Sequence, residues 1–215
     1  RSRGLGDVYK RQIQDRPVLY YSLKAFEDSA VDEIVLVVGK GEEKFCRKEI
    51  VDKYGISKVK AIVEGGKERY HSVFEGLKQT SDADYVLIHD GARPFVNQDI
   101  IRRCMQEVQK YQACVVGMPV KDTIKIADEE GYAKQTPDRK NVWMIQTPQT
   151  FSYALIYEAY EEMLKTEDTA ITDDAMVLER IKGKKSKLIE GSYRNIKITT
   201  PEDLLIANVY LQHPE

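Results

Sequence analysis

The sequence predicts an α/β fold: a doubly wound, mostly parallel sheet with an inserted antiparallel β-arm. Short β-branched runs alternate with longer amphipathic segments between Glu33 and Met118, which is the order of strands and helices in a parallel sheet. Between Lys121 and Gln146 this alternation stops, and two short segments flank turn residues, as in a hairpin. We therefore expect one α/β domain over residues 13–215, with residues 121–147 forming the arm.

The expected strands are short apolar runs. Ile34–Val38 is almost entirely β-branched, which is typical of a strand buried on both faces. In the arm, DTIKIAD and NVWMIQ are expected to form antiparallel strands, with a turn at Glu130-Gly131. The other expected strands are Glu33–Val38, Val59–Val63, Tyr85–Ile88, Ala113–Met118 and Asn195–Thr199.

The expected helices have an apolar face or a recognisable start. Pro17 is expected at the first position of a helix, where its missing N–H costs nothing. Thr200 is a good helix cap, followed by Pro201 and two acids in the first turn. The remaining expected helices are Glu42–Tyr54, Glu68–Lys78, Ile100–Tyr111, Tyr153–Leu164, Asp173–Ile181 and Pro201–Leu211.

Length and composition exclude several classes of protein. The chain has 215 residues, 42% of them hydrophobic and 32% charged, which is the mix of an ordinary globular domain. Its 33 basic and 35 acidic residues give a net charge of −2, without the basic excess of a nucleic-acid binder. The longest apolar runs are too short to cross a membrane. Three cysteines without paired spacing, Cys46, Cys104 and Cys114, favour a reducing cytoplasm over a disulfide scaffold or a zinc site.

Residues 1–12 do not continue the pattern. The segment RSRGLGDVYKRQ has the period of neither a strand nor a helix, and it lacks the apolar run of a signal peptide. We expect this segment to be disordered and, from its similarity to a translated cloning scar, non-native. The alternative is a natural basic tail.

Polar clusters follow the expected strands, and open parallel sheets bind their ligands at such strand ends. In the first cluster, Gly65 and Gly66 end a strand and open a helix. Backbone N–H groups and the hydroxyl of Ser72 can therefore approach a ligand closely. A plain strand-to-helix turn is the alternative for this cluster.

The second cluster is HDGARPF, directly after a buried strand. Asp90 can hold a hard divalent cation, Ala92 leaves room for a nucleotide, and Arg93 can bind a phosphate through two N–H groups. His89 is expected to be a buried hydrogen-bonding residue and His71 an exposed helix residue.

A third, dispersed cluster supplies hydroxyls and charges suited to a phosphorylated, hydroxylated ligand: Lys121, Asp122, Thr123, Arg139, Thr147, Thr172, Asp173, Asp174 and Lys197.

Six segments in a fixed order resemble one enzyme family. They are GGKERYHSVFEGL, IHDGARPFV, PVKDTIK, IQTPQTF, ITDDAMVLE and NIKITTPEDL. From about Ile13 onward the chain resembles the 2-C-methyl-D-erythritol 4-phosphate cytidylyltransferases of isoprenoid precursor synthesis. The ribitol-5-phosphate cytidylyltransferases of teichoic-acid synthesis share most of these motifs, but Gly91-Ala92 before Arg93 favours the erythritol enzymes. The resemblance implies a Rossmann-like fold of the nucleotidyltransferase type. It also implies transfer of a cytidylyl group from CTP to a polyol phosphate, with release of pyrophosphate.

The resemblance further implies the role of each residue. Gly65, Gly66 and Ser72 are expected to line the cytidine pocket, with Ala92 against the nucleotide, and Asp90 is expected to carry Mg²⁺. The residues expected to hold the polyol phosphate are Arg93, Thr123, Arg139, Thr147, Thr172 and Lys197. Of these, Arg139 and Lys197 are the expected catalytic residues, which orient the attacking phosphate. In this family the arm crosses to a second subunit, so we expect a homodimer in which Arg139 completes the neighbour's site.

One family feature is missing from the front of the sequence. Members resemble one another in an apolar strand and a loop of the type AAGxGxR that wraps the triphosphate, whereas residues 1–12 offer neither. The missing strand is expected near the middle of the sheet. Two further hypotheses therefore stand beside the enzyme: an inactive fragment that binds nucleotide or dimerises, and a non-catalytic α/β binding module.

Overall fold

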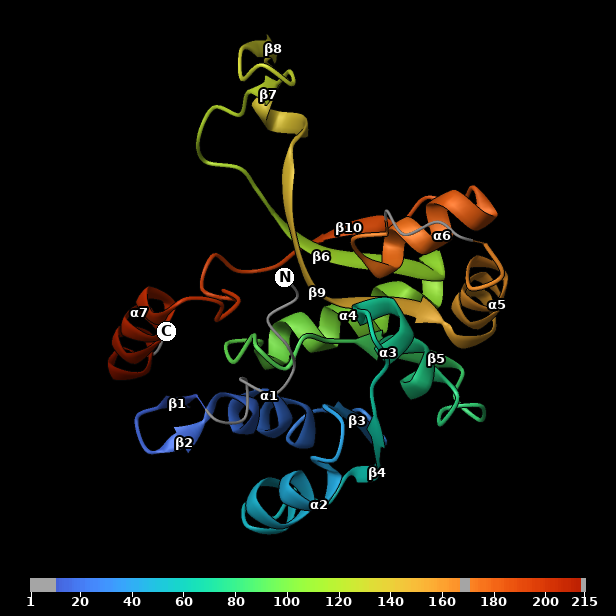
Figure 1. Ribbon diagram of the computed structural model, residues 1–215, viewed down its shortest axis with the longest axis vertical. Coiled ribbons are helices and arrows are strands. Elements are labelled where there is room, and N and C mark those ends of the chain that lie inside the picture. The colour runs from blue at the N-terminus through green and yellow to red at the C-terminus, as the bar shows by residue number, and fades with distance from the viewer. Residues whose placement is uncertain (1–10, 167–170, 214–215) are drawn as a thin grey trace.

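The main sheet of the protein has four strands in the order β10–β6–β9–β5 (Figure 1). This arrangement comes from a computed structural model, which describes residues 11–166 and 171–213. β5 and β10 run parallel to β6, whereas β9 is antiparallel to both of its neighbours. The predicted α/β class is therefore confirmed. The four strands are β5 (Tyr85–Ile88), β6 (Ala113–Pro119), β9 (Trp143–Ser152) and β10 (Lys187–Glu190).

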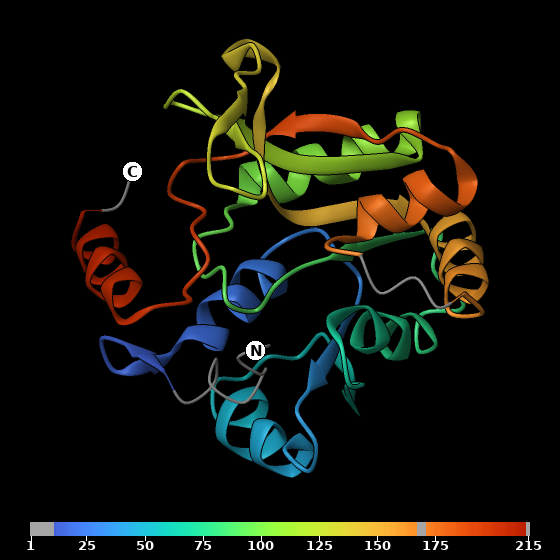
Figure 2. The same ribbon diagram turned by 45° about the horizontal axis from the view of Figure 1, so that its top comes forward.

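Helices cover both faces of this sheet, because alternate residues of β6 point to opposite sides. Ala113 and Val115 pack in a cluster with helices α3, α5 and α6, whereas Cys114 and Val116 pack with α4 and the end of α1. The sheet is thus wound on both sides, as predicted (Figure 2). The helices are α1 (Val18–Glu27), α3 (Arg69–Leu77), α4 (Gln98–Tyr111), α5 (Tyr153–Met163) and α6 (Asp174–Lys182).

A second, two-stranded parallel sheet pairs β3 (Ile34–Val38) with β4 (Val59–Glu64). Helix α2 (Glu43–Cys46) and the π-helix η2 (Arg47–Asp52) connect these strands in place of the single predicted helix. β3 and β5 each keep one edge that pairs with no strand of the described residues. The inner strand that the family resemblance implies would pair at such an edge, and it stays a prediction.

The two ends of the described chain meet in a small apolar cluster. Ile13 and Val18 pack with Ile198 and Ala207, the last of which lies in α7 (Pro201–Gln212). Ile13 belongs to a short hairpin of β1 (Gln12–Ile13) and β2 (Arg16–Pro17). Gln12 pairs in this hairpin, and the carbonyl of Arg11 accepts a hydrogen bond from Val18 N–H (2.9 Å), so the prediction of disorder is wrong for residues 11 and 12. Residues 1–10 of that segment lie outside the described residues.

The starts of α1 and α7 can be compared with the predicted helix starts. Pro17 ends β2 and precedes α1, so it does not occupy the first helical position as predicted. At α7 the prediction is confirmed, because the Thr200 hydroxyl accepts a hydrogen bond from the backbone N–H of Asp203. The Asp203 carboxylate accepts in return from the backbone N–H of Thr200, so the two residues form a capping box.

The strand predicted over residues 195–199 is wrong. This segment is an extended loop, attached to the rest of the fold by hydrogen bonds such as that from Ile198 N–H to the carbonyl of Ala92 (2.8 Å). The strand that completes the main sheet is β10, which the sequence analysis did not predict. Its four residues, KLIE, bury only Ile189 because β10 lies at the sheet edge, so its apolar pattern is weak.

The predicted arm projects from the main sheet (Figure 1). Its tip contains β7 (Ile126–Ala127) paired with β8 (Ala133–Gln135), followed by the 3₁₀-helix η3 (Arg139–Asn141). The second predicted arm strand, NVWMIQ, is instead the beginning of β9, which continues into the main sheet beside β6. Pro148 lies within β9, and a proline in a strand weakens the strand signal because it has no N–H to donate.

The three cysteines are buried free thiols. Across residues 11–166 and 171–213, no helix combines the length and apolar character needed to cross a membrane.

Candidate active site

The glycine turn between β4 and α3 is held by the hydroxyl of Ser72. Ser72 Oγ accepts a hydrogen bond from Gly66 N–H (3.1 Å) and donates to the carbonyl of Glu68 (3.2 Å). The approach is close enough that a Cβ added to Gly65 would lie 2.6 Å from this oxygen, and one on Gly66 would collide with His71. The structure therefore brings Gly65, Gly66 and Ser72 together, as the sequence predicts.

The side chain of His71 also takes part in this turn. Its Nδ1 accepts a hydrogen bond from Glu68 N–H (3.3 Å), so the imidazole caps the first turn of α3. The prediction of a simply exposed helix residue was incomplete, because a ring nitrogen can take the place of the usual capping carboxylate.

The loop after β5 carries Asp90 and is fixed from two sides. The hydroxyl of Ser22 in α1 donates to the carbonyls of Gly91 (3.0 Å) and Arg93 (3.1 Å). On the other side, Thr147 Oγ1 accepts from the backbone N–H of Asp90 (3.1 Å) and lies 3.0 Å from Nδ1 of His89. Thr147 is buried, and its hydroxyl is engaged in holding this loop.

The segment 195–198 crosses the same loop and brings Lys197 to Asp90. Arg93 Nη1 donates to the carbonyl of Asn195 (2.8 Å), and the carbonyl of Ala92 accepts from Ile198 N–H (2.8 Å). These bonds place Lys197 Nζ 2.9 Å from Oδ2 of Asp90, although 107 positions separate the two residues in the sequence.

Asp90 lies among three cationic side chains. Its Oδ1 accepts from Nε of Arg69 (3.3 Å), and its Oδ2 lies 2.9 Å from Lys197 and 3.9 Å from Nε of Arg93. Burial raises the pKa of this carboxyl, but the charges of Arg69 and Lys197 outweigh burial and hold its pKa well below the usual range. Asp90 is therefore an ionised carboxylate within a positively charged cluster.

Arg69 belongs to a buried network that the sequence analysis missed. Its Nη1 and Nη2 each donate to the carboxylate of Asp174 at 2.8 Å, and Asp174 is fully buried. The phenol of Tyr160 donates to Asp174 Oδ1 (2.6 Å), and Gln149 Oε1 accepts from the Asp174 backbone N–H (3.0 Å). A signal for this network was present, because Asp174 precedes the buried Val177 and Leu178 by three and four positions and so shares their helix face.

Three of the predicted site residues make no described contact with Asp90 within a single chain. Arg139 lies in η3, where its Nη1 donates to the carbonyl of Lys121 (2.9 Å), and Thr123 is exposed on the same arm. The arm projects from the main sheet (Figure 1), and no contact described for Asp90 involves either of these two residues. Thr172 is exposed just before α6, with its hydroxyl 3.7 Å from the sulfur of Met176.

The donor chemistry of Asp90 fits a magnesium ion that arrives with a nucleotide. Mg²⁺ prefers oxygen ligands and in nucleotide sites uses one or two carboxylates together with substrate phosphates. Among the described residues, no group of three or more His, Cys, Asp or Glu side chains could hold a metal ion on its own. The single ionised carboxylate therefore suits a metal that phosphate oxygens help to hold, and the nearby cations oppose the binding of a bare metal ion.

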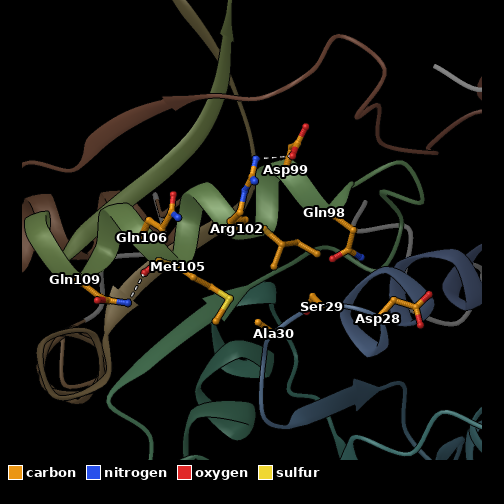
Figure 3. A pocket seen from close by; sticks show the side chains of 10 residues that line it. Asp28, Ser29, Ala30, Gln98, Asp99, Arg102, Met105, Gln106 and Gln109 are labelled. Atoms are coloured by element: carbon orange, nitrogen blue, oxygen red, sulfur yellow. Dashed lines mark hydrogen bonds and ion pairs between the residues drawn. The ribbon is translucent and has the colours of Figure 1, made fainter.

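A pocket of about 410 Å³ lies beside α4 and does not include the candidate site (Figure 3). None of the residues predicted to bind nucleotide, polyol phosphate or metal lines it. It is lined by the three residues that follow α1 and by one side of α4: Asp28, Ser29, Ala30, Gln98, Asp99, Ile101, Arg102, Met105, Gln106 and Gln109.

His89 makes the stability of the protein sensitive to acid. Burial is the main cause that lowers its pKa from 6.5 to about 4, and both ring nitrogens are engaged, one with the Thr147 hydroxyl and one with the carbonyl of Arg93. The unfolded chain therefore takes up this proton at higher pH than the folded chain does. The free energy of unfolding should be unaffected by His89 above pH 6.5 and fall by up to about 1.4 kcal/mol per pH unit below it.

Urea unfolding between pH 7 and pH 4.5 measures this loss. The variant His89→Gln should show a smaller decrease over that range, whereas the control His213→Gln should keep the decrease of the original chain. An equal decrease in all three proteins would assign the acid sensitivity to other groups. Asp90 does not interfere with the measurement. The stability that its lowered pKa contributes is lost only when the pH falls below the ordinary pKa of 3.8.

Comparison with known proteins identifies the family of the chain. The family model of 2-C-methyl-D-erythritol 4-phosphate cytidylyltransferase matches residues 4–213, a range that begins within the segment 1–12. The chain is 52% identical over 203 residues to the enzyme of that name from Lachnospira eligens, covering 94% of this chain and 89% of the relative. It is 48% identical over 200 residues to the one from Lachnoclostridium phytofermentans, covering 93% and 86%.

Solved structures with the same fold carry the same activity in their names. The 4-diphosphocytidyl-2C-methyl-D-erythritol synthase of Anaerococcus prevotii superposes with a TM-score of 0.86 at 38% identity, covering 94% of this chain and 88% of that one. The 2-C-methyl-D-erythritol 4-phosphate cytidylyltransferase of Thermus thermophilus superposes with a TM-score of 0.81 at 32% identity, covering 97% and 96%. On the match of the family model and of these relatives, the chain belongs to the 2-C-methyl-D-erythritol 4-phosphate cytidylyltransferase family.

Proposed function

We propose that the residues around Asp90 transfer a cytidylyl group from CTP to 2-C-methyl-D-erythritol 4-phosphate. The products are the CDP-polyol and pyrophosphate. Family membership and the names of the relatives support this reaction. The structural observation that carries it is the ionised carboxylate of Asp90 held among Arg69, Arg93 and Lys197 at the carboxyl end of β5. One carboxylate among several cations is what a reaction between two phosphate groups requires.

In this reaction an oxygen of the polyol phosphate attacks the α-phosphorus of CTP, and the bond from that phosphorus to the pyrophosphate oxygen breaks. Catalysis is therefore positioning and charge neutralisation. Lys197 is exposed enough to exchange Asp90 for a phosphate oxygen, and the buried Nε of Arg93 has no hydrogen-bond partner among the described residues. Mg²⁺, when bound through Asp90, would neutralise charge on the phosphates of CTP.

The nucleotide and the polyol phosphate are proposed to lie on either side of this cluster. Gly65, Gly66 and Ser72 would line the cytidine pocket, because two residues without a Cβ let a base approach the backbone of this turn closely, with Ala92 against the nucleotide. The residues proposed for the polyol phosphate are Arg93, Thr123, Thr147, Thr172 and Lys197, together with Arg139. The hydroxyl of Thr147 would act mainly by holding the Asp90 loop, since it already bonds the Asp90 N–H.

Pyrophosphate release by the chain of 215 residues, with CTP and Mg²⁺, tests the reaction. We expect faster release with 2-C-methyl-D-erythritol 4-phosphate than with ribitol 5-phosphate. Comparable rates with the two substrates would contradict the proposed substrate. The absence of release with both would favour the inactive fragment, and that outcome is checked by repeating the assay after family residues for the triphosphate loop are added upstream of Ile13.

We also propose that the protein is a homodimer in the cytoplasm and that Arg139 acts in the neighbour's site. The exposed position of Arg139 on a projecting arm supports this arrangement. If Arg139 acts across the dimer, Arg139→Gln and Lys197→Gln chains co-expressed in equal amounts form heterodimers with one intact site each. Because half of the dimers are then mixed, activity should return to about a quarter of the original.

Separately tagged chains allow the heterodimers to be purified before the assay. The matched controls are the two homodimeric variants, each of which should be inactive. If Arg139 acts within its own chain, every site of the heterodimer carries one defect. A purified heterodimer that is as inactive as the controls would therefore contradict the proposal.

A further inference from the structure

Arg69 uses its guanidinium to hold two carboxylates at once. The two terminal nitrogens form a bidentate pair with Asp174, each at 2.8 Å, and the remaining Nε donates to Oδ1 of Asp90 at 3.3 Å. A planar guanidinium with five donors in fixed directions can make both sets of bonds together, which the ammonium of a lysine cannot do.

Asp174 is a rigid anchor for this guanidinium. It is fully buried, and Tyr160, also fully buried, donates a hydrogen bond of 2.6 Å to its Oδ1. The backbone of the same turn is fixed by Gln149, whose Oε1 accepts from the N–H groups of Asp174 (3.0 Å) and Ala175 (2.9 Å). The plane of Arg69 is therefore set by groups of β9, α5 and α6 that do not themselves contact Asp90 in the described interactions.

The two strong cationic contacts of Asp90 differ in how firmly they are held. The Lys197 side chain is 41% exposed, and among the described residues its ammonium forms one ion pair, that with Asp90 Oδ2. Arg69 is held by two short bonds to a buried carboxylate, and the charge of Asp174 outweighs burial and keeps the pKa of Arg69 above its ordinary value. A phosphate that draws Lys197 away would therefore free Oδ2 of Asp90 and leave Oδ1 in place.

We infer that Arg69, anchored by Asp174, is a positioning residue that fixes the Asp90 carboxylate by its Oδ1, so that Oδ2 is the oxygen offered to the divalent cation of the nucleotide complex. This inference rests on the proposed function, because it assigns Arg69 a role through the metal-binding carboxylate. It also explains why Asp174 is an aspartate in an otherwise apolar cluster with Ala175, Val177 and Leu178.

The test is the gain in CTP affinity that Mg²⁺ produces, measured by calorimetry without polyol phosphate, so that no transfer occurs. Affinity is measured in EDTA and in excess Mg²⁺ for the original chain, Arg69→Lys and Asp174→Asn. A residue that orients a metal ligand typically changes metal affinity by about 10- to 100-fold when it is replaced. We expect the Mg²⁺-dependent gain to fall by that factor in both variants, while the affinity in EDTA changes about twofold or less.

Three controls separate this role from a general loss of structure. Lys182→Gln breaks a surface ion pair between α6 and α5 (2.8 Å to Glu162) and should keep the full gain. Asp90→Asn should abolish the gain, and circular dichroism at the same temperature checks that each variant is folded.

The outcomes distinguish the role proposed for Asp90 from the roles inferred for Arg69 and Asp174. If the original chain binds CTP with no gain from Mg²⁺, or if Asp90→Asn keeps the gain, the proposed role of Asp90 fails. If the gain depends on Asp90 but a folded Arg69→Lys variant retains it, the positioning role of Arg69 is wrong. If Arg69→Lys loses the gain while a folded Asp174→Asn variant keeps it, the anchoring by Asp174 is wrong.

Discussion

Replacing Asp90 by Asn should lower the rate of cytidylyl transfer on the order of 10³-fold, the size of effect that follows removal of one electrostatic group from a reaction centre. Asparagine has the same shape but no charge, so the three cations around it lose their common counter-charge. The neutral amide is also a poor ligand for Mg²⁺. Pyrophosphate release at saturating CTP and polyol phosphate measures the change.

A matched control for this variant is Asp99→Asn. Asp99 also lies shortly after β5 and forms an ion pair with an arginine, Arg102 (2.7 Å), but it is exposed on α4 and lies outside the candidate site. Its replacement should change the rate about twofold or less. A folded Asp90→Asn variant with more than about a tenth of the original rate would contradict the central place of Asp90 in the reaction.

The candidate site residues whose proximity the sequence predicted lie in contiguous motifs. Gly65, Gly66 and Ser72 lie close together in the chain, and Asp90 directly follows a strand with a strong apolar signal. Their proximity is set by local backbone geometry, which short sequence patterns report directly. Asp90 and Lys197 are distant in sequence, and the family resemblance assigned them to two ligands of one reaction, Asp90 to Mg²⁺ and Lys197 to the polyol phosphate.

The fold was predicted less well where tertiary contacts decide the structure. β10 has a weak apolar pattern and exists because the edge of β6 is available to pair with it. β9 runs through Pro148 because two neighbouring strands, β5 and β6, hold it on both sides. Conversely, residues 195–199 have an alternating pattern but bond the loop at Ala92 and Arg93 instead of a strand. Local propensity does not determine such outcomes.

The network of Arg69 and Asp174 shows a different limit of sequence reasoning. A charged pair separated by 105 positions leaves no local signature, and acids in the first turn of a helix usually act as exposed partners of the helix dipole. In the sequence, the only sign that Asp174 is buried is its position as an acidic residue on the apolar face of α6. Such a mismatch is a reason to look for a buried partner, because an ionised carboxylate is costly to bury alone.

Replacing Asp174 by Ala should therefore destabilise the protein by about 3 kcal/mol, the lower end of the cost of breaking a buried ion pair from one side, because the Arg69 side chain is 34% exposed and water can partly solvate it. Of its two partners among the described residues, the guanidinium of Arg69 would keep Asp90, and the buried phenol of Tyr160 would lose the acceptor it now has in Asp174. Urea unfolding at pH 7 measures the loss. The control Glu162→Ala breaks an exposed ion pair between α5 and α6 and should cost less than about 1 kcal/mol. A loss for Asp174→Ala as small as that of the control would contradict the prediction.

A triple variant, Arg69→Met with Asp174→Leu and Tyr160→Phe, separates stability from function in the same region. A well-packed apolar replacement of a buried ionic group is often neutral or stabilising, so this variant should regain most of the stability that Asp174→Ala loses. It should nevertheless remain deficient in the Mg²⁺-dependent gain in CTP affinity, because nothing then holds Asp90 Oδ1. Recovery of stability without recovery of this gain would mean that the ionic network serves the orientation of Asp90, whereas recovery of both would show that the network is needed for neither.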